Sequence, residues 1–346
     1  MARARTGIVV TGGAGFIGSA FVRSALARRP GARVVTLDAL TYAGSLENLR
    51  GLPDADRHTF VEGDVRDGAL VRDLLDEHDV GLVVHLAAES HVDRSIAGPA
   101  AFVETNVLGT QALLDACRDA WAEGDGFAEG VRFHHVSTDE VYGDLGPDDP
   151  AFTERTPYAP SSPYSASKAG SDHLVRAYSR TYGLPVTITN CSNNYGPRQY
   201  PEKLIPVVLQ RALAGEPIPV YGDGSNVRDW LYVGDHCDAI WAVIERGGVG
   251  ETYNVGGHAE VDNLTLVRAL CDVLDRRRPD AAPHADLITF VTDRPGHDRR
   301  YAVDTSKIER LGWAPRQSLR SGLEATVDWY LANQGWVEAV ADEAAR

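Results

Sequence analysis

The sequence has no long uncharged apolar run and few cysteines. No stretch of about 20 apolar residues occurs, so we expect no membrane-spanning helix. The first residues lead into a glycine-rich turn rather than into the apolar core of a signal peptide, and none is expected. The cysteines, at positions 117, 191, 237 and 271, lie far apart and form no CxxC pair. Their spacing argues against a zinc site or a disulfide scaffold and favours a reducing, cytoplasmic location.

Positive charge is also scarce. The chain has 34 basic and 49 acidic residues, a formal net charge of −15. A field of this sign repels phosphate, so neither nucleic acid nor an anionic membrane is expected as a partner. A phosphorylated small molecule would need a local group of cations. Lysine occurs only at positions 168, 203 and 307, which gives more weight to a lysine that falls within a motif.

What is present is a regular alternation of strands and helices in the first half of the 346 residues. Short apolar runs predict buried strands at 8–10, 34–37, 59–61, 82–86, 133–136 and 186–189, and helical patterns cover 16–28, 68–77, 102–121 and 164–182. This order predicts an α/β fold with a doubly wound parallel Rossmann sheet.

The rhythm changes near residue 189, where glycine and proline become frequent. We expect a Rossmann domain over residues 1–189 and a smaller α+β domain over 190–346, with segments around 225–260 able to rejoin the first sheet. Helices of the second domain are expected at 204–214, 235–245, 264–277 and 321–333.

A glycine-rich turn follows the first strand and opens the first helix. Gly12, Gly15 and Gly18 permit a tight turn, close approach of a diphosphate, and close helix–strand packing, in that order. Asp38 lies 20 residues after Gly18. Its carboxylate would accept from a ribose 2′-hydroxyl and repel a 2′-phosphate, which predicts NAD rather than NADP. Asp64, after the third strand, fits an adenine contact or a cap of the next helix equally well.

Two further motifs indicate chemistry. Tyr164 and Lys168 stand four residues apart on one predicted helix face, where a nearby ammonium and a nicotinamide cation would favour the phenolate. Thr138, Asp139 and Glu140 follow the strand at 133–136, at the sheet edge where ligands bind. Alone, this triplet would be taken for a helix cap and a turn. Beside Tyr164 and Lys168, its adjacent carboxyls can act as an acid and a base.

Longer segments give the chain a resemblance to a known family. They are TGGAGFIG (11–18), LAAESHVDRS (86–95), STDEVYG (137–143), TPYAPSSPYSASK (156–168), TNCSNNYGP (189–197), PEKLIP (201–206), RDWLYV (228–233), YNVGG (253–257) and RPGHDRRYAVD (294–304). With these segments the chain resembles the dTDP-glucose 4,6-dehydratase family of the extended short-chain dehydrogenase/reductase superfamily, up to about Trp336. Gly234 departs from the family pattern, which often has an acid there.

The resemblance implies a lyase of deoxysugar biosynthesis. In the cycle it implies, Tyr164 deprotonates the C4 hydroxyl of dTDP-glucose while hydride passes to NAD, Glu140 removes the C5 proton, and Asp139 protonates the departing C6 hydroxyl. Hydride then returns to C6 and C5 is reprotonated, giving dTDP-4-keto-6-deoxyglucose with NAD tightly bound and regenerated in each cycle. Asp139 must be protonated, and its neighbour Glu140 would raise its pKa.

The resemblance also implies two sets of ligand contacts. Together with the glycine motif, Tyr164 and Lys168, the residues implied to contact NAD are Phe16, Ile17, Asp38, Leu40, Thr41, Asp64, Val65, Leu86, Ala87, Ala88, Ser90 and Thr105. The residues implied to contact the nucleotide sugar, chiefly in the second domain, are Ser90, Thr138, Asn193, Asn194, Lys203, Leu204, Pro219, Val220, Tyr221, Arg228, Asn263, Arg294, His297 and Asp298. Lys203 and Arg228 are the cations expected at the diphosphate, although an arginine beside Asp229 would, alone, be taken for a surface ion pair.

Other functions stay open at this point. A nucleotide-sugar 4-epimerase needs only Tyr164 and Lys168, so the adjacent acids favour a dehydratase. A decarboxylase should bring a spare cation to a C6 carboxylate, and a non-catalytic NAD-sensing protein would usually lack the Tyr/Lys pair. The histidines show no metal-ligand spacing, so no metal is expected and core or supporting roles are favoured. The resemblance further implies a homodimer, with the helices at 102–121 and 164–182 as candidates for its interface.

Overall fold

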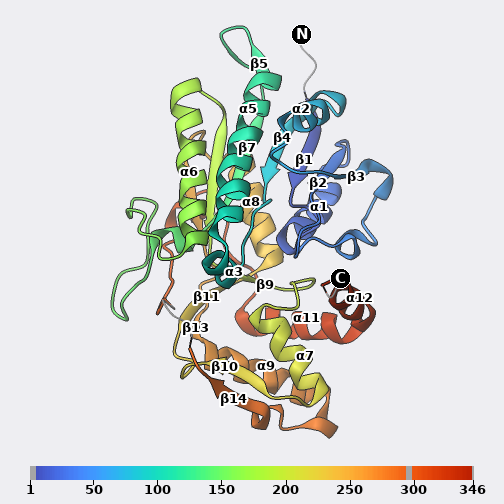
Figure 1. Cartoon of the computed structure of the whole chain (residues 1–346), viewed down its shortest axis with the longest axis vertical. Helices are drawn as coiled ribbons and strands as arrows, with labels where there is room; N and C mark the ends of the chain where they lie inside the picture. The colour runs from blue at the N-terminus through green and yellow to red at the C-terminus, as the bar shows by residue number, and fades with distance from the viewer. Residues whose placement is uncertain (1–4, 294–297, 345–346) are drawn as a thin grey trace.

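The computed structural model describes residues 5–293 and 298–344. Its centre is a seven-stranded sheet in the order β12-β8-β7-β4-β1-β2-β3, in which every neighbouring pair is parallel. The strands are β1 (Gly7–Thr11), β2 (Val34–Asp38), β3 (His58–Glu62), β4 (Val80–His85), β7 (Arg132–Thr138), β8 (Val186–Cys191) and β12 (Thr252–Val255). This sheet, with helices on both faces, confirms the predicted doubly wound α/β fold (Figure 1).

Two apolar layers cover the sheet. On one face α1 (Phe16–Arg28) and α8 (Val233–Arg246) pack together, and the rings of Phe21 and Trp241 stack with centroids 5.0 Å apart. The other face is covered by α2 (Gly68–Glu77), α5 (Thr110–Trp121) and α6 (Pro163–Tyr182). These helices bury β-branched and leucine side chains of the strands, which is why the strands read as continuous apolar runs.

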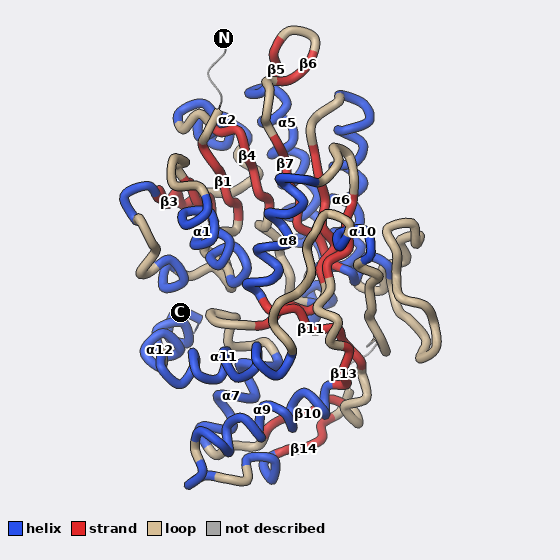
Figure 2. Tube along the Cα trace, turned by 180° about the vertical axis from the view of Figure 1, so that it is seen from behind, coloured by secondary structure: helices blue, strands red, loops and turns tan. Residues whose placement is uncertain are grey.

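The second lobe lies beyond the carboxyl ends of these strands (Figures 1 and 2). It has a three-stranded sheet of β13 (Glu260–Asp262), β11 (Val227–Tyr232) and β9 (Asn193–Tyr195), and a parallel pair of β10 (Ile218–Tyr221) and β14 (Ile288–Val291). Its helices are α7 (Leu204–Ala214), α9 (Asn263–Arg277), α11 (Leu319–Ala332) and α12 (Gln334–Ala344). They enclose a second apolar core.

Shorter elements lie in the connections between these helices and strands. They are η1 (Leu46–Leu49), η2 (Ala55–Arg57), α3 (Val92–Ala97), α4 (Pro99–Phe102), the π-helical η3 (Val103–Gly109), β5 (Ala122–Glu123), β6 (Gly126–Phe127), η4 (Asp139–Tyr142), η5 (Pro279–Ala281), η6 (His284–Leu287) and α10 (Ser306–Glu309). Of the helices within the described ranges, none has the length and apolar character that a bilayer crossing requires.

Three details differ from the sequence-based expectations or refine them. The strand predicted at 59–61 is not buried but only partly covered, because β3 lies at the edge of the sheet. The single helix predicted over 102–121 is divided by the π-helical η3 before α5. β12 joins the main sheet beside β8, whereas β11 pairs with β9 and β13 in the second lobe. The boundary at residues 189 and 190 stays a prediction.

Candidate active site

A cavity of about 510 Å³ opens at the carboxyl ends of the parallel strands. The glycine-rich turn, the ends of β2, β4, β7 and β8, and the first turns of α6 line it. Parallel α/β sheets place ligand sites at this edge, because the connecting segments leave the strands there. The cavity also reaches residues 199, 200 and 203 of the second lobe, so both lobes contribute to one site.

The glycine-rich turn has the geometry of an anion-binding loop. Gly12 has a φ of +68°, and a Cβ there would lie 2.6 Å from the backbone nitrogen of Ala87. A Cβ on Gly18 would overlap the carbonyl oxygen of Gly12. Gly15 is the N-cap of α1 and no side chain caps the helix, so the N–H groups of its first turn remain for a ligand. These features fit a dinucleotide diphosphate.

Asp38 closes the same end of the cavity. Its Oδ2 accepts a hydrogen bond from the backbone N–H of Ala14 and its Oδ1 accepts one from Leu40, both at 2.9 Å. Burial raises the pKa of Asp38, and these two hydrogen bonds oppose that effect. Each oxygen keeps a second lone pair, so the carboxylate could also accept from a ribose hydroxyl. Leu40, with a φ of +48°, carries the turn but does not line the cavity.

Asp64 lines the cavity, and its helix-cap alternative is wrong. The carboxylate of Asp64 pairs with Arg66, whose guanidinium approaches to 2.7 Å. Its hydrogen bond with Arg66 is the main reason that the pKa of Asp64 is lowered. The cap of α2 is Asp67, which accepts from Ala69 and Leu70.

The Thr-Asp-Glu triplet ends β7 and begins the 3-10 turn η4. Thr138 is the N-cap of that turn: its hydroxyl accepts from the N–H of Glu140 at 3.3 Å and donates to Asp139 at 3.4 Å. All three residues line the cavity. The triplet is therefore a cap and a part of the cavity wall at once.

Asp139 is a buried acid next to another acid. Asp139 is 1% exposed, and its Oδ2 has no hydrogen-bond partner among the described residues. Burial raises the pKa of Asp139 well above its ordinary value, and the charges of Glu140 and Asp229 raise it further. This environment favours the protonated form of the carboxyl and leaves one of its oxygens for a ligand.

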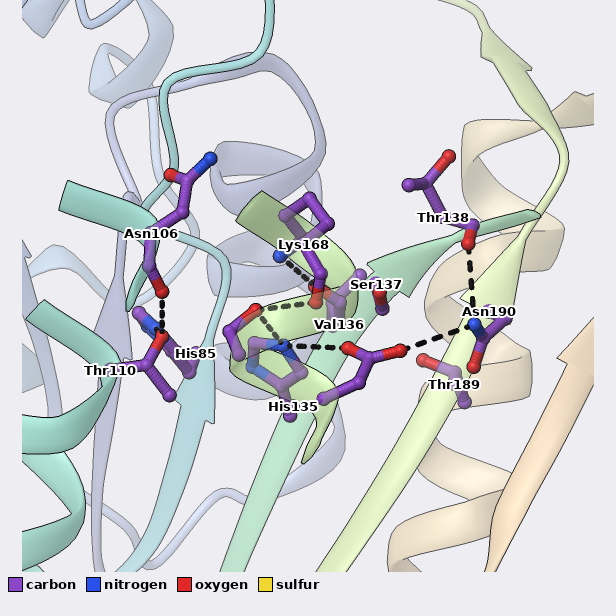
Figure 3. A network of polar contacts seen from close by, with 12 residues as sticks. His85, Asn106, Thr110, His135, Val136, Ser137, Thr138, Lys168, Thr189 and Asn190 are labelled. Carbon is purple, nitrogen blue, oxygen red and sulfur yellow. Dashed lines mark hydrogen bonds and ion pairs between the residues drawn. The ribbon is translucent and has the colours of Figure 1, made fainter. Parts of the chain in front are cut away.

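Tyr164 and Lys168 come from the first turns of α6. Ser162 and Ser165 form a capping box, and Pro163 occupies the first helical turn, so the start of the helix is firmly fixed. Lys168 is 4% exposed, and its Nζ donates to the carbonyl oxygen of Val136 on β7 at 2.9 Å (Figure 3). Both residues line the cavity beside the Thr-Asp-Glu triplet.

The protein groups around Tyr164 act on its pKa in the direction opposite to the one expected with a bound nicotinamide cation. Burial raises it well above the ordinary value, the negative charges of Glu140 and Cys191 add to this, and a hydrogen bond with Thr138 opposes it. The protein groups around the phenol therefore favour its protonated form. Burial also lowers the pKa of Lys168, against the effect of Asp172. To form the phenolate of Tyr164 expected from the sequence, the site needs more positive charge than Lys168 and the other protein groups supply.

The implied cofactor contacts converge on one cavity. Except for Leu40, all of them line it. So do four of the implied substrate contacts, Ser90, Asn193, Asn194 and Lys203, in addition to Thr138. The implied substrate contacts outside its lining are Leu204, Pro219, Val220, Tyr221, Arg228, Asn263 and Asp298. Arg294 and His297 lie outside the described residues.

Arg228 is not the surface ion pair that its neighbour Asp229 suggested. It is 5% exposed, and its guanidinium donates to the carbonyl oxygens of residues 227, 298 and 299 and lies 4.4 Å from the ring centroid of Tyr301. The carboxylate of Asp229 instead accepts from the N–H groups of Gly257 and Ala259, each at 2.7 Å. Because the side chains of Arg228 and Asp229 are both buried, each bonds to fixed backbone groups and the two do not form a solvent-exposed ion pair with each other.

Sequence reasoning missed several cavity residues, among them Tyr42, Glu89, Glu104, Cys191, Gln199 and Tyr200. Tyr42 and Glu89 directly follow or precede predicted contacts, so extending each motif by one residue would have found them. Glu104 lines the cavity from the π-helical η3 and precedes the implied contact Thr105, so the same extension would have found it.

The buried histidines His85 and His134 hydrogen bond to threonine side chains in and beside the main sheet. His134 is fully buried, with Nδ1 2.9 Å and Nε2 3.2 Å from the hydroxyls of Thr187 and Thr189. His85 lies between the hydroxyls of Thr11 and Thr110. Across residues 5–293 and 298–344, no group of three or more acidic, cysteine or histidine side chains is arranged to hold a metal ion.

Comparisons with known proteins agree with this geometry. A sequence model of the family described as GDP-mannose 4,6 dehydratase matches residues 9–326. A dTDP-glucose 4,6-dehydratase of Xanthomonas campestris pv. campestris (strain B100) is 61% identical over 338 residues, covering 96% of this chain and 95% of that protein. The crystal structure of the Streptomyces venezuelae dTDP-glucose 4,6-dehydratase DesIV, with NAD bound, superposes with a TM-score of 0.88 at 49% identity and covers 97% of this chain and 100% of its own. The Bacillus anthracis dTDP-glucose 4,6-dehydratase in complex with NAD gives a TM-score of 0.85 at 44% identity, covering 97% and 99%.

Proposed function

The chain belongs to the dTDP-glucose 4,6-dehydratase family, and from this premise we propose that it is a lyase that converts dTDP-glucose into dTDP-4-keto-6-deoxyglucose with NAD as its resident cofactor. The observation that carries the proposal is the meeting of Asp139, Glu140, Tyr164 and Lys168 in the cavity that the glycine-rich turn opens. An epimerase or a simple dehydrogenase would need the phenol and the ammonium but not the adjacent pair of acids.

The residues that would hold NAD are those around the glycine-rich turn. The uncapped N-terminus of α1 would bind the diphosphate, and Asp38 would accept from the ribose. Ala87, Ala88, Ser90 and Thr105 line the same cavity and would contact the rest of the cofactor. When bound, NAD supplies the hydride acceptor for C4 and the hydride donor for C6, so no external oxidant or reductant is consumed.

Tyr164 would act on the C4 hydroxyl. Its phenolate oxygen would accept the proton of the sugar C4 hydroxyl as the hydride leaves C4, and Thr138, which hydrogen bonds to the phenol, would orient both groups. Lys168 stands one helical turn away on the same face of α6 and would contribute positive charge to the phenolate. Its fixed bond to Val136 holds that charge in place.

Asp139 and Glu140 would eliminate water across C5 and C6. A ketone at C4 acidifies the neighbouring C5 proton, which the Glu140 carboxylate removes. The protonated Asp139 gives its proton to the C6 hydroxyl, which leaves as water while the C5–C6 double bond forms. The raised pKa of Asp139 supports the donor role.

Lys203 and Arg228 would hold the nucleotide diphosphate against the strongly acidic background, and Asn194 would contact the nucleotide sugar. Lys203 and Asn194 line the cavity. Arg228 would act partly through the backbone it anchors at residues 298 and 299. The exposed Tyr221, at the end of β10, offers a ring face on which the nucleobase would stack.

We further propose a homodimer that works in the cytoplasm. Val103 and Leu108 on η3 and Tyr182 on α6 are about half exposed, at 49%, 50% and 49%, although all three are apolar or aromatic. A second copy packed on these helices would bury them. The cytoplasmic location is supported by four cysteines that are all unpaired and buried. Light scattering of the purified protein tests the dimer.

The activity is tested by product analysis. Purified protein should convert dTDP-glucose, without added oxidant, into a product that has lost one water and shows a C4 keto group and a C6 methyl group by mass spectrometry and NMR. UDP-glucose in a parallel incubation tests the thymine preference. Inversion at C4 with no loss of water would establish an epimerase instead.

A further inference from the structure

The C-terminal helix α12 lies against the segment that follows β2, although nearly 300 residues separate them (Figures 1 and 2). Nε1 of Trp336 on α12 donates to Oδ1 of Asn48 on η1 at 3.0 Å. Nδ2 of Asn48 in turn donates to the carbonyl oxygen of Ala14 at 2.8 Å. Only one orientation of the amide satisfies both bonds, so Asn48 connects the second lobe to the glycine-rich turn.

The backbone of Ala14 hydrogen bonds to several segments that form the cofactor end of the cavity. Its N–H donates to Asp38 at 2.9 Å, and its carbonyl oxygen accepts from Asn48 and from the N–H of Ser45 at 3.1 Å. The segment between Asp38 and Ser45, residues 39–44, supplies five lining residues of the cavity: Ala39, Thr41, Tyr42, Ala43 and Gly44. Both ends of this cofactor loop (residues 39–44) are therefore anchored on Ala14.

Trp336 is partly buried and packs against the core of the second lobe. Its ring packs against Trp329 and Tyr330, with centroids 5.1 and 6.0 Å away. Asn48 is 3% exposed, so its bonds to Trp336 and Ala14 are shielded from water. Arg23 of α1 also holds η1, through the carbonyl oxygens of Asn48 and Gly51 at 2.8 Å, but it belongs to the Rossmann lobe itself. Trp336 adds a link between lobes.

We propose that Trp336 is a positioning residue for cofactor retention: its indole N–H holds Asn48, and through Asn48 it keeps the cofactor loop closed on bound NAD. The inference rests on the proposed function, in which NAD ends each cycle in its starting form. Such a cofactor has to stay bound between turnovers, and opening of the loop would release it. Docking of the substrate lobe through α12 therefore slows the loss of NAD.

The test is the rate at which NAD leaves the purified holoenzyme. Trp336→Phe keeps an aromatic ring against Trp329 and removes the indole N–H. After dilution into a trap for free NAD, this variant should lose NAD about two- to tenfold faster than the unaltered protein, the range expected for one shielded hydrogen bond. Trp329→Phe is the matched control, because it alters the same aromatic cluster without touching Asn48. It should release NAD at the original rate.

A double-variant cycle separates positioning from general loosening. If Trp336 acts through Asn48, adding Trp336→Phe to Asn48→Ala should change the release rate no further. Equal release from Trp336→Phe and the unaltered protein, or additive effects in the double variant, would overturn the inference. If Asn48→Ala does not fold, the comparison of the two tryptophan variants decides. An unaltered protein that is purified without NAD and has no dehydratase activity would contradict the proposed function instead.

Discussion

Oδ1 of Asp172 lies 3.2 Å from Nε2 of His135, and neither side chain is exposed to solvent. The other oxygen of Asp172 accepts from the hydroxyl of Tyr158 at 2.7 Å. Burial alone would raise the pKa of Asp172, but the hydrogen bond with His135 and the positive charges of Lys168 and Arg176 outweigh it and lower the pKa. Asp172 is thus an ionised carboxylate one turn beyond Lys168 on α6.

This arrangement predicts the effect of Asp172→Asn. Burial lowers the pKa of Lys168, and Asp172 opposes that shift, so the neutral amide should lower the pKa of Lys168 further. Since the proposed chemistry needs the ammonium, the alkaline limb of the kcat profile should move to lower pH. The variant should also lose about 3 kcal/mol of unfolding free energy at neutral pH. Because the pKa of Asp172 is lowered by folding, this difference should shrink as the pH falls below about 4.

The control for Asp172→Asn is Ser171→Ala. The hydroxyl of Ser171 lies 3.3 Å from Nε2 of His135 and donates to the carbonyl oxygen of Lys168 at 2.8 Å, but it carries no charge. Its removal should leave the alkaline limb in place. The other titratable groups that interact with Lys168 are His85, His135 and Cys191. Neither Asp172→Asn nor Ser171→Ala replaces any of them. An unshifted limb in Asp172→Asn would contradict the counter-ion role.

Asp139→Asn should stabilise the protein while reducing its activity. Folding raises the pKa of Asp139, first through burial and then through Glu140, so ionisation of this carboxyl opposes folding. The loss of folding stability caused by ionisation of Asp139 is absent below the unfolded-state pKa of about 4 and grows as the pH rises toward the folded-state pKa. The variant should therefore gain stability over the unaltered protein from acidic to neutral pH, measured by denaturant unfolding. Water elimination should fall about 10²- to 10⁴-fold, as for loss of a general acid. A variant less stable at neutral pH would contradict the buried-acid interpretation.

Glu140→Gln should separate the first half of the reaction from the second. The amide cannot remove the C5 proton, whereas Tyr164 and Lys168 remain in place to act at C4. With dTDP-glucose, the absorbance of reduced cofactor should appear and persist, while water release falls about 10²- to 10⁴-fold. Rapid-mixing absorbance and product NMR measure the two effects. Water release at a normal rate would assign the base to another residue.

The sequence predicted the residues that line the cavity better than it predicted the contacts that hold the surrounding segments together. Strand–turn–helix units carry their own signals, so α1, α2 and α7 begin and end at the residues expected. The chemistry-bearing residues follow those strands, and parallel topology alone brings them to one edge. Contacts between distant segments had no such local signal. The hydrogen bond from Trp336 to Asn48 depends on how the second lobe docks.

Electrostatics was the weakest part of the sequence-based prediction. Spacing alone showed that Tyr164 and Lys168 share a helix face, and it favoured a lowered pKa of the phenol. The depth of burial, which sequence does not give, raises the pKa of the phenol among the protein groups alone, whereas the expected phenolate also included the charge of a bound nicotinamide. For Asp139 the same burial adds to the effect of Glu140, so the expected rise in pKa and the one found agree.

Gly18→Ala tests whether close packing at the glycine-rich turn holds the cofactor. A Cβ on Gly18 would overlap the carbonyl oxygen of Gly12, so the start of α1 has to move away from the turn. Such overpacking costs about 1–3 kcal/mol of stability. It should also lower the NAD content after gel filtration, because the helix N-terminus no longer faces the diphosphate. Gly31→Ala is the matched control: Gly31 has nothing within 4 Å of the added carbon, and NAD content and unfolding temperature should stay almost unchanged. If both variants retained NAD equally, the turn would not be the part of the protein that binds the diphosphate.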